Sequence, residues 1–256
     1  MSFPTINPIA LSIGPINIHW YGIAYCIGIL CGYQLAKQCV KKIQFPINLS
    51  DFASTIAIGI IIGGRLGYVL FYEPLYYAEH LIEVFALWKG GMSFHGGALG
   101  AFIATILTCK KHGLSIHKGL DILALCATPG LCFGRIANFI NGELYGRITS
   151  APWGMVFPNG GPLLRHPSQL YEAFFEGIIL FIILAIIFQK YYAQGRIFSV
   201  FVIGYGMIRF VLEFTREPDA QLGLLTLQLS MGQYLSIGMI ALGVLWTYAR
   251  NKQFIH

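Results

Sequence analysis

The residues best suited to chemistry lie in one short run, Gly134–Gly146, directly after an apolar stretch of the chain. Its polar members include an arginine, two asparagines and a glutamate: Arg135, Asn138, Asn141 and Glu143. In lipid such groups are costly unless they meet partners, so the run is a hypothesis for a functional site. A guanidinium is a planar, permanently charged fork that matches phosphate oxygens, which favours an anionic ligand. Asn141 and Gly142 are interpreted as the end of a helix.

A second polar stripe lies further along the chain. Tyr205, Arg209, Glu213 and Arg216 recur at helical spacing and therefore share one face. One alternative is that Arg209 and Glu213, four residues apart, only neutralise each other on the helix surface. The longer stripe suits the wall of a polar cavity better than an isolated pair does.

His95 and Arg65 complete the set of ionisable residues of interest. His95 lies in Ser93–Gly97, where two glycines leave the imidazole accessible. Histidine is suited to general base catalysis because its unperturbed pKa is near physiological pH, although a lone histidine near an interface is more often structural. Arg65 lies in a run with a glycine at every fourth position, Gly59–Gly67, a small-residue face that lets helices approach closely. It is either a third guanidinium for the site or a packing tie.

The composition indicates the environment of these residues. The chain has 256 residues, of which 56% are hydrophobic and only 11% charged, and its mean hydropathy is +0.65. A soluble domain usually carries about 25% charged residues. We therefore predict a membrane protein with a single transmembrane domain, residues 1–256. The N-terminus lacks the basic segment that begins a cleavable signal peptide.

The cysteines and other potential ligands give no sign of a metal or redox site. None of the six cysteines belongs to a CxxC pair, so we interpret them as small buried hydrophobes. No His, Asp or Glu cluster has credible metal spacing. Ser93 near His95 is only a weak hint of a serine hydrolase, because adjacency in sequence is not a triad. We therefore expect neither a zinc site nor a disulfide framework.

Seven apolar stretches are long enough to be membrane helices, since crossing the bilayer core takes roughly 20 residues. They are residues 18–36, 52–72, 92–109, 119–140, 170–189, 196–214 and 231–249. The predicted fold class is all-α, a polytopic membrane protein. Of the longer connections, residues 73–91 are expected to lie along the interface, and residues 141–169, rich in proline and glycine, to form a loop.

The distribution of lysine and arginine sets the predicted orientation, because cytoplasmic loops carry an excess of both. One side collects ten: Lys37, Lys41, Lys42, Lys110, Lys111, Lys118, Lys190, Arg196, Arg250 and Lys252. The other side has four: Lys89, Arg147, Arg165 and Arg216. The first side is predicted to be cytoplasmic, with the N-terminus outside and the C-terminus inside. The net charge of +6 is then mainly an orientation signal, so a nucleic acid partner is discounted.

This orientation brings the polar residues to one depth. Arg65, Arg135 and Arg209 lie roughly 7–11 Å below the outer surface, at a helical rise of 1.5 Å per residue. His95 lies at a similar depth, and Glu143 and Glu213 slightly higher. Guanidiniums beside a histidine suit a phospholipid headgroup, so the site is predicted to face the outer leaflet of the lipid bilayer.

On these residues, the chain resembles the prolipoprotein diacylglyceryl transferase family of bacterial membrane enzymes. The run Gly134–Gly146 matches the pattern Gly-Arg-x-x-Asn-Phe-x-Asn-x-Glu-x-x-Gly. Four more family-like blocks occur in order: His19–Gly22, Ser93–Gly97, His166–Glu172 and Tyr205–Asp219. The resemblance spans nearly the whole chain.

The resemblance implies a transferase of lipoprotein biosynthesis in the bacterial plasma (inner) membrane. Such an enzyme moves the diacylglyceryl group of phosphatidylglycerol onto the lipobox cysteine thiol of a preprolipoprotein, which its signal peptide presents. A thioether forms and glycerol 1-phosphate leaves. No cofactor or metal is implied.

The same resemblance implies roles for individual residues. Arg135 and Arg209 would bind the lipid phosphate, and His95 would be the base or would orient the thiol. The other residues would shape the headgroup pocket: Tyr21, Asn138, Glu143, Tyr205, Glu213 and Arg216. Arg65 is kept as a further substrate-binding residue.

Two other classes of membrane protein compete with this interpretation. A lipid or anion transporter explains the buried arginines, but not the accessible histidine or the large outer loop, and no internal repeat supports an inverted-repeat architecture. An intramembrane protease needs a Ser/His, paired-Asp or HExxH arrangement within the spans, and the sequence has none.

Overall fold

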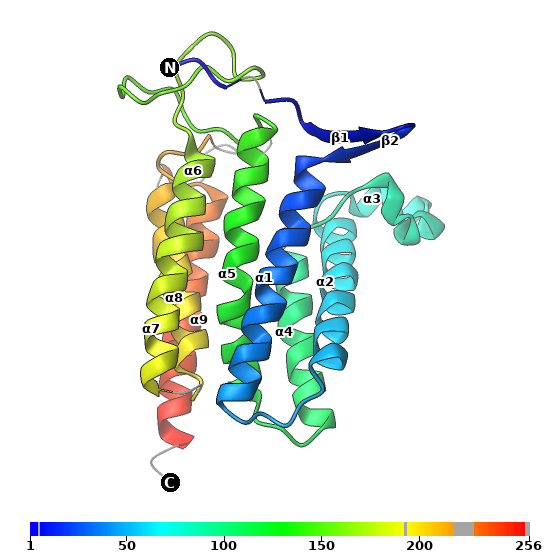
Figure 1. The fold of residues 1–256 in the computed structure, drawn as a ribbon, viewed down its shortest axis with the longest axis vertical. Coiled ribbons are helices and arrows are strands. Elements are labelled where there is room, and N and C mark those ends of the chain that lie inside the picture. The colour runs from blue at the N-terminus through cyan, green and yellow to red at the C-terminus, as the bar shows by residue number, and fades with distance from the viewer. Residues whose placement is uncertain (5, 192–193, 218–227, 254–256) are drawn as a thin grey trace. The chain divides into compact units, whose positions relative to one another are not determined.

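Helices dominate the structure, a computed structural model that describes residues 1–4, 6–191, 194–217 and 228–253 (Figure 1). The long ones are α1 (Trp20–Lys42), α2 (Leu49–Phe71), α4 (Phe94–Lys111), α5 (Ile116–Ile140), the continuous segment from α6 to α7 (Ser168–Tyr191), α8 (Arg196–Leu212) and α9 (Met231–Gln253). Each coincides with one of the predicted stretches, which confirms their helical character. The last two residues of the Tyr205–Asp219 block lie outside the described residues.

Four of these helices are long and apolar enough to cross a membrane, judged by length and composition. They are α1, α2, α5 and the segment Ser168–Tyr191. The chain therefore has the helices of a polytopic membrane protein. Crossing by all seven helices and the orientation of the termini stay predictions.

A two-stranded hairpin near the N-terminus is absent from the all-α prediction, so the fold is mostly rather than wholly helical. Strands β1 (Ile9–Ile13) and β2 (Ile16–His19) pair antiparallel. They are joined by Gly14 and Pro15, and Gly14 has a φ of 58°, which glycine adopts at little cost. The strands have only five and four residues, which is too short a pattern to be recognised in so hydrophobic a chain.

The structure divides into two compact units. Unit 1 comprises Met1–Leu35 and Ala124–His256, and unit 2 comprises Ala36–Leu123. A single transmembrane domain over residues 1–256 stays a prediction.

In unit 2, α2 and α4 pack glycine against glycine, as the small-residue face predicts. A Cβ atom on Gly63 or on Gly100 would collide with the main-chain carbonyl of Gly96 or of Gly59, respectively. Ser93 caps the start of α4, because its Oγ accepts a hydrogen bond from the Gly96 amide at 3.2 Å. The Ser93 cap thus marks the start of α4, next to the close approach of the two backbones.

In unit 1, α8 lies against both α7 and α9 (Figure 1). Helix α5 continues through Pro129, which has no amide to donate to the carbonyl of Leu125. The Thr128 hydroxyl donates to that carbonyl instead, at 2.8 Å. This substitute bond satisfies the carbonyl and lets α5 run on to the polar run at its C-terminal end.

The two long connections differ in structure. Residues 73–91 form α3 (Pro74–Glu79) and two 3₁₀ turns, η1 (Leu81–Phe85) and η2 (Leu87–Lys89). Several of their apolar side chains are exposed, as expected for a segment along the interface: Leu75, Leu81, Ile82, Phe85 and Trp88. The connection after α5 is a loop, as predicted, until Ser168 starts the next helix.

We predict that Gly100→Ala destabilises unit 2 by about 1–3 kcal/mol, because its methyl group would meet the Gly59 carbonyl and force α2 and α4 apart. Thermal unfolding is measured in detergent, and its extent is read from chemical labelling of the Cys109 thiol, which is fully buried in the folded protein. Gly238→Ala in α9 is the control, since no atom lies within 4 Å of its Cβ position. Equal unfolding midpoints for the two variants would contradict the prediction.

Candidate active site

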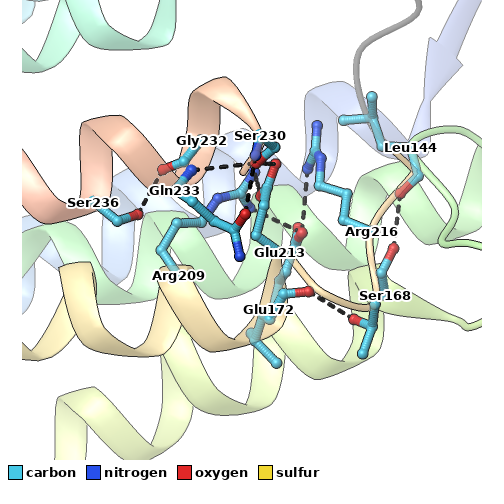
Figure 2. Close-up of polar contacts among 12 residues, drawn as sticks. Leu144, Ser168, Glu172, Arg209, Glu213, Arg216, Ser230, Gly232, Gln233 and Ser236 are labelled. Carbon is cyan, nitrogen blue, oxygen red and sulfur yellow. Dashed lines mark hydrogen bonds and ion pairs between the residues drawn. The ribbon is translucent and has the colours of Figure 1, made fainter. Parts of the chain in front are cut away.

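Three arginines and three glutamates of unit 1 form one ionic cluster. Its members are Arg135 of α5, Glu172 at the end of α6 (Ser168–Glu172), Glu176 in the following π-helical stretch (Ala173–Ile179), Arg209 of α8, and Glu213 and Arg216 just after α8. Figure 2 shows that the side chains of Glu172, Arg209, Glu213 and Arg216 gather in one place. Residues from three distant parts of the sequence therefore meet here.

The carboxylate of Glu172 is the centre of this cluster. Its Oε2 lies 2.9 Å from Nε of Arg135, and its Oε1 lies 2.9 Å from Nη1 of Arg209 and 3.2 Å from Nη1 of Arg216. The Glu172 side chain is only 1% exposed. An isolated carboxylate so deeply buried would be very costly, and three guanidiniums offset that cost.

Glu176 is the second buried carboxylate, with a side chain that is 0% exposed. Its oxygens lie 3.6 Å from Nη1 of Arg209 and 3.9 Å from Nη2 of Arg135, and neither makes a hydrogen bond within the described part of the chain. π-helical turns are rare and often occur at functional sites. The π-helical stretch here carries Glu176 next to both arginines.

Glu213 joins the cluster to α9. Its Oε2 lies 3.0 Å from Nη2 of Arg209, and its Oε1 accepts a hydrogen bond from the Ser230 hydroxyl at 3.0 Å (Figure 2). Ser230 and Gln233 also bond each other reciprocally at the start of α9, as in a capping box. Gly232 leaves the room for the carboxylate, since a Cβ atom there would lie 2.6 Å from Oε1.

The C-terminal end of α5 brings Asn138 and Glu143 together. The Gly142 amide bonds the Phe139 carbonyl, and the Glu143 amide bonds the Asn138 carbonyl, which is the Schellman pattern. Gly142 has a φ of 65°, so the predicted helix end at Asn141 and Gly142 is confirmed. The turn places the Glu143 carboxylate where it accepts a hydrogen bond from Nδ2 of Asn138 at 2.7 Å.

Tyr21 of α1 lies beside this pair, close enough for its hydroxyl to interact with the Asn138 and Glu143 side chains. The Glu143 carbonyl accepts a further hydrogen bond from Nε2 of the buried Gln169 at 2.6 Å. The Ser168 hydroxyl donates to the Leu144 carbonyl at 3.0 Å (Figure 2). These bonds tie the end of α5 to the segment that carries Glu172.

The loop after α5 is anchored to the residues that follow α8. Nε of Arg147 donates to the Arg216 carbonyl at 2.8 Å, and Gly146 pairs with Arg216 as an isolated bridge. Further along the loop, the Tyr171 hydroxyl lies 3.2 Å from Nδ1 of His166, and burial lowers the pKa of this imidazole. The neutral ring at pH 7 suits a hydrogen-bonding role in holding the loop.

Electrostatically, the cluster is balanced, with three guanidiniums facing three carboxylates. The arginine side chains keep 14–17% exposure, whereas those of Glu172, Glu176 and Glu213 keep 0–7%. The arginine side chains are therefore the more accessible members of the cluster. The arrangement can bind a phosphate group through more than one guanidinium fork.

Comparison with known proteins agrees with this geometry. The model of the family described as Prolipoprotein diacylglyceryl transferase matches residues 8–249. The chain belongs to the prolipoprotein diacylglyceryl transferase family.

Curated relatives cover almost the whole chain, and each bears the name phosphatidylglycerol–prolipoprotein diacylglyceryl transferase. The protein from Wolbachia pipientis subsp. Culex pipiens is 50% identical over 249 residues, covering 94% of either chain. That from Agrobacterium fabrum is 49% identical over an alignment of 265 residues, covering 98% of this chain and 94% of the relative. That from Rickettsia rickettsii (strain Sheila Smith) is 50% identical over 249 residues, covering 95% and 96%.

Several residues singled out from the sequence are in this ionic cluster. The structure brings Arg135, Arg209, Glu213 and Arg216 together, and it pairs Asn138 with Glu143. Arg209 and Glu213 do form an ion pair at a spacing of four residues, as one alternative proposed. Both side chains also have partners on other elements, so the pair is part of a larger network. Tyr205, buried in α8, lies about one turn before Arg209.

His95 and Arg65 belong to unit 2. His95 lies in the first turn of α4, directly after the Ser93 cap, and its side chain is exposed. Arg65 is 3% exposed and donates only to main-chain carbonyls among its hydrogen bonds within the described residues. That pattern favours the packing tie over a third phosphate ligand. A common site for His95 and Arg135 stays a prediction.

The sequence interpretation missed Glu172 and Glu176 as members of the ionic cluster. A signal was present, because two carboxylates four residues apart interrupt the predicted span 170–189. The same spacing drew attention to Arg209 and Glu213. The high hydropathy of the segment around Glu172 and Glu176 concealed this signal.

We predict that Glu172→Gln lowers the free energy of unfolding by about 3–5 kcal/mol, because three partly buried guanidiniums lose the charge of the buried carboxylate they share. Chemical denaturation in detergent micelles provides the measurement. The control is Glu217→Gln, since Glu217 is 48% exposed in its pair with Arg165 and should cost about 1 kcal/mol or less. Similar losses for both variants would show that Glu172 is not the central contact.

Proposed function

We propose that the chain transfers the diacylglyceryl group of phosphatidylglycerol to the lipobox cysteine thiol of preprolipoproteins, the first step of bacterial lipoprotein maturation. Family membership and the names of relatives that cover 94% or more of the chain support this function. The observation that carries it is the convergence of Arg135 and Arg209 on one carboxylate, each at 2.9 Å. A carboxylate oxygen pair is a fair stand-in for two oxygens of a phosphodiester.

The reaction exchanges one bond to a glycerol carbon for another. The thiol sulfur forms a bond to the terminal carbon of the diacylglyceryl group, and the bond from that carbon to the phosphate oxygen breaks. The thiol proton is removed, and glycerol 1-phosphate leaves with the electron pair. Because negative charge grows on the departing phosphate, preorganised guanidiniums are the main source of catalysis expected here.

The proposed roles follow from this charge. Arg135 and Arg209 bind the phosphate, and His95 either removes the thiol proton or orients the thiol. Arg216 stands beside the phosphate ligands, which suits a role in the headgroup pocket. The other proposed pocket residues are Tyr21, Asn138, Glu143, Tyr205 and Glu213.

The proposed setting is the bacterial inner membrane, crossed by all seven long helices, with the N-terminus outside and the site open to the outer leaflet. The count of basic residues in the connections supports this orientation. The lipid then arrives laterally, and the signal peptide arrives as a membrane helix. No cofactor is needed for this chemistry.

The decisive experiment mixes the purified protein with phosphatidylglycerol and a lipobox peptide. Transfer appears as a diacylglyceryl mass shift on the peptide cysteine. A transporter of lipids or anions would leave the peptide unmodified but would move lipid between leaflets of a vesicle.

We predict that Arg135→Ala lowers the transfer rate at least about 10²-fold, the scale for loss of one preorganised charge-stabilising donor. Arg196→Ala is the control, because Arg196 begins α8 and stacks on Tyr191, at the opposite end of the helix from Arg209. Near wild-type activity of Arg135→Ala would remove Arg135 as the phosphate anchor.

We predict that His95→Gln loses activity and recovers part of it at higher pH if His95 removes the proton. A free thiol has a pKa of about 8.5, so alkaline solution supplies thiolate without a base. The rate is measured from pH 6 to pH 9.5, with His112→Gln at the other end of α4 as the control. Loss of activity with no recovery would assign His95 to orientation of the thiol instead.

A further inference from the structure

Arg65 has an unusual set of partners for an arginine in a membrane helix. Its Nε donates to the Val84 carbonyl at 2.8 Å. Its Nη2 donates to the carbonyls of Glu83 at 2.6 Å and Ala86 at 3.3 Å. Its Nη1 donates to the Gly90 carbonyl and, at 3.1 Å, to the Gly91 carbonyl.

These five hydrogen bonds use all five N–H donors of the guanidinium. The Tyr77 ring also lies 5.1 Å from Cζ, which adds a cation–π contact. A lipid phosphate could bind Arg65 only by displacing main-chain carbonyls. The partners therefore indicate that Arg65 organises the protein rather than the lipid.

The segment that Arg65 holds is one that needs support. Residues 81–91 contain only the short turns η1 and η2, followed by Gly90 and Gly91 with φ values of 79° and 80°. Short 3₁₀ turns leave carbonyls with few regular partners, and such groups are costly where water is scarce. Arg65 supplies donors to five of these carbonyls from a single side chain.

The same segment leads directly to His95. The Ser93 amide bonds the carbonyl of Gly64, the residue before Arg65, at 2.8 Å. Ser93 then caps α4, and His95 follows two residues later in the first turn. The contacts that hold residues 83–91 on α2 therefore also position the start of α4, and with it the His95 side chain.

We propose that Arg65 is a positioning residue for His95. It holds the main chain of residues 83–91 on α2, so that α4 starts where His95 meets the thiol substrate. The proposal rests on the proposed function and on the role of His95 in it. Arg65 itself contacts neither the lipid nor the thiol.

The first test measures kcat and KM for phosphatidylglycerol in Arg65→Lys and Arg65→Met, on folded protein isolated by size-exclusion chromatography. A lysine has three donors and no planar fork, so it can replace only part of the contacts. We expect kcat to fall about 10²-fold in Arg65→Met and less in Arg65→Lys, because small misplacements of a catalytic group carry costs of this size. KM for phosphatidylglycerol should stay within about twofold.

Two results of this test would overturn the proposal. A large rise in KM with little change in kcat would make Arg65 a lipid ligand. An unchanged kcat in the folded fraction would show that Arg65 only stabilises the fold and does not position His95. Lys89→Met is the matched control, since Lys89 lies in the same segment, is 53% exposed and forms a salt bridge with the Glu83 side chain.

The second test is a double-mutant cycle between Arg65→Lys and His95→Gln. If Arg65 acts through His95, the double variant should be about as slow as His95→Gln alone, because the second change has nothing left to misplace. If the two rate losses multiply, Arg65 acts independently of His95 and the proposal fails. An inactive wild-type protein would instead refute the proposed function, so the two failures are distinguishable.

Discussion

The shared carboxylate of Glu172 is the contact on which the architecture of unit 1 depends. Arg135, Arg209 and Arg216 all reach it, and they come from the end of α5 and from α8 and the turn that follows it. Burying any one of these charges without compensation would cost several kcal/mol. Charge therefore holds the helices at one relative position at this end, where the hydrophobic effect gives little driving force for association in lipid.

This balance has a consequence for binding an anion. The three guanidiniums and three carboxylates are formally neutral together, so a phosphodiester adds a charge that nothing in the cluster yet offsets. The arginine side chains are 14–17% exposed and that of Glu172 only 1%, so in the proposed function the phosphate would contact the arginines rather than the buried carboxylate. Part of each guanidinium can then turn from Glu172 to the phosphate, while the buried carboxylate keeps the arginines preorganised.

The sequence predicts the helices and part of this cluster for physical reasons that are local. Apolar runs mark the helices, and the charge pattern of Arg209 and Glu213 follows from helical spacing. The end of α5 at Asn141 and Gly142 is likewise local, because a left-handed residue is needed there. Glu172 and Glu176 were not recognised because their importance depends on partners far away in sequence. The hairpin of β1 and β2 was missed for a different reason, since it is too short to show a clear alternation.

Arg65 and Arg135 illustrate why residue type alone does not identify a ligand-binding arginine. Both lie in apolar helices, and in the sequence either arginine is a candidate phosphate ligand. The ionic partners of Arg135 are carboxylate side chains, which can rotate or share a guanidinium with an incoming anion. The partners of Arg65 are five main-chain carbonyls, which cannot leave without unfolding their segment. An arginine can exchange its partner for substrate only where that partner is itself able to move. The partners of an arginine are set by the fold, so residue type alone does not show whether they can move.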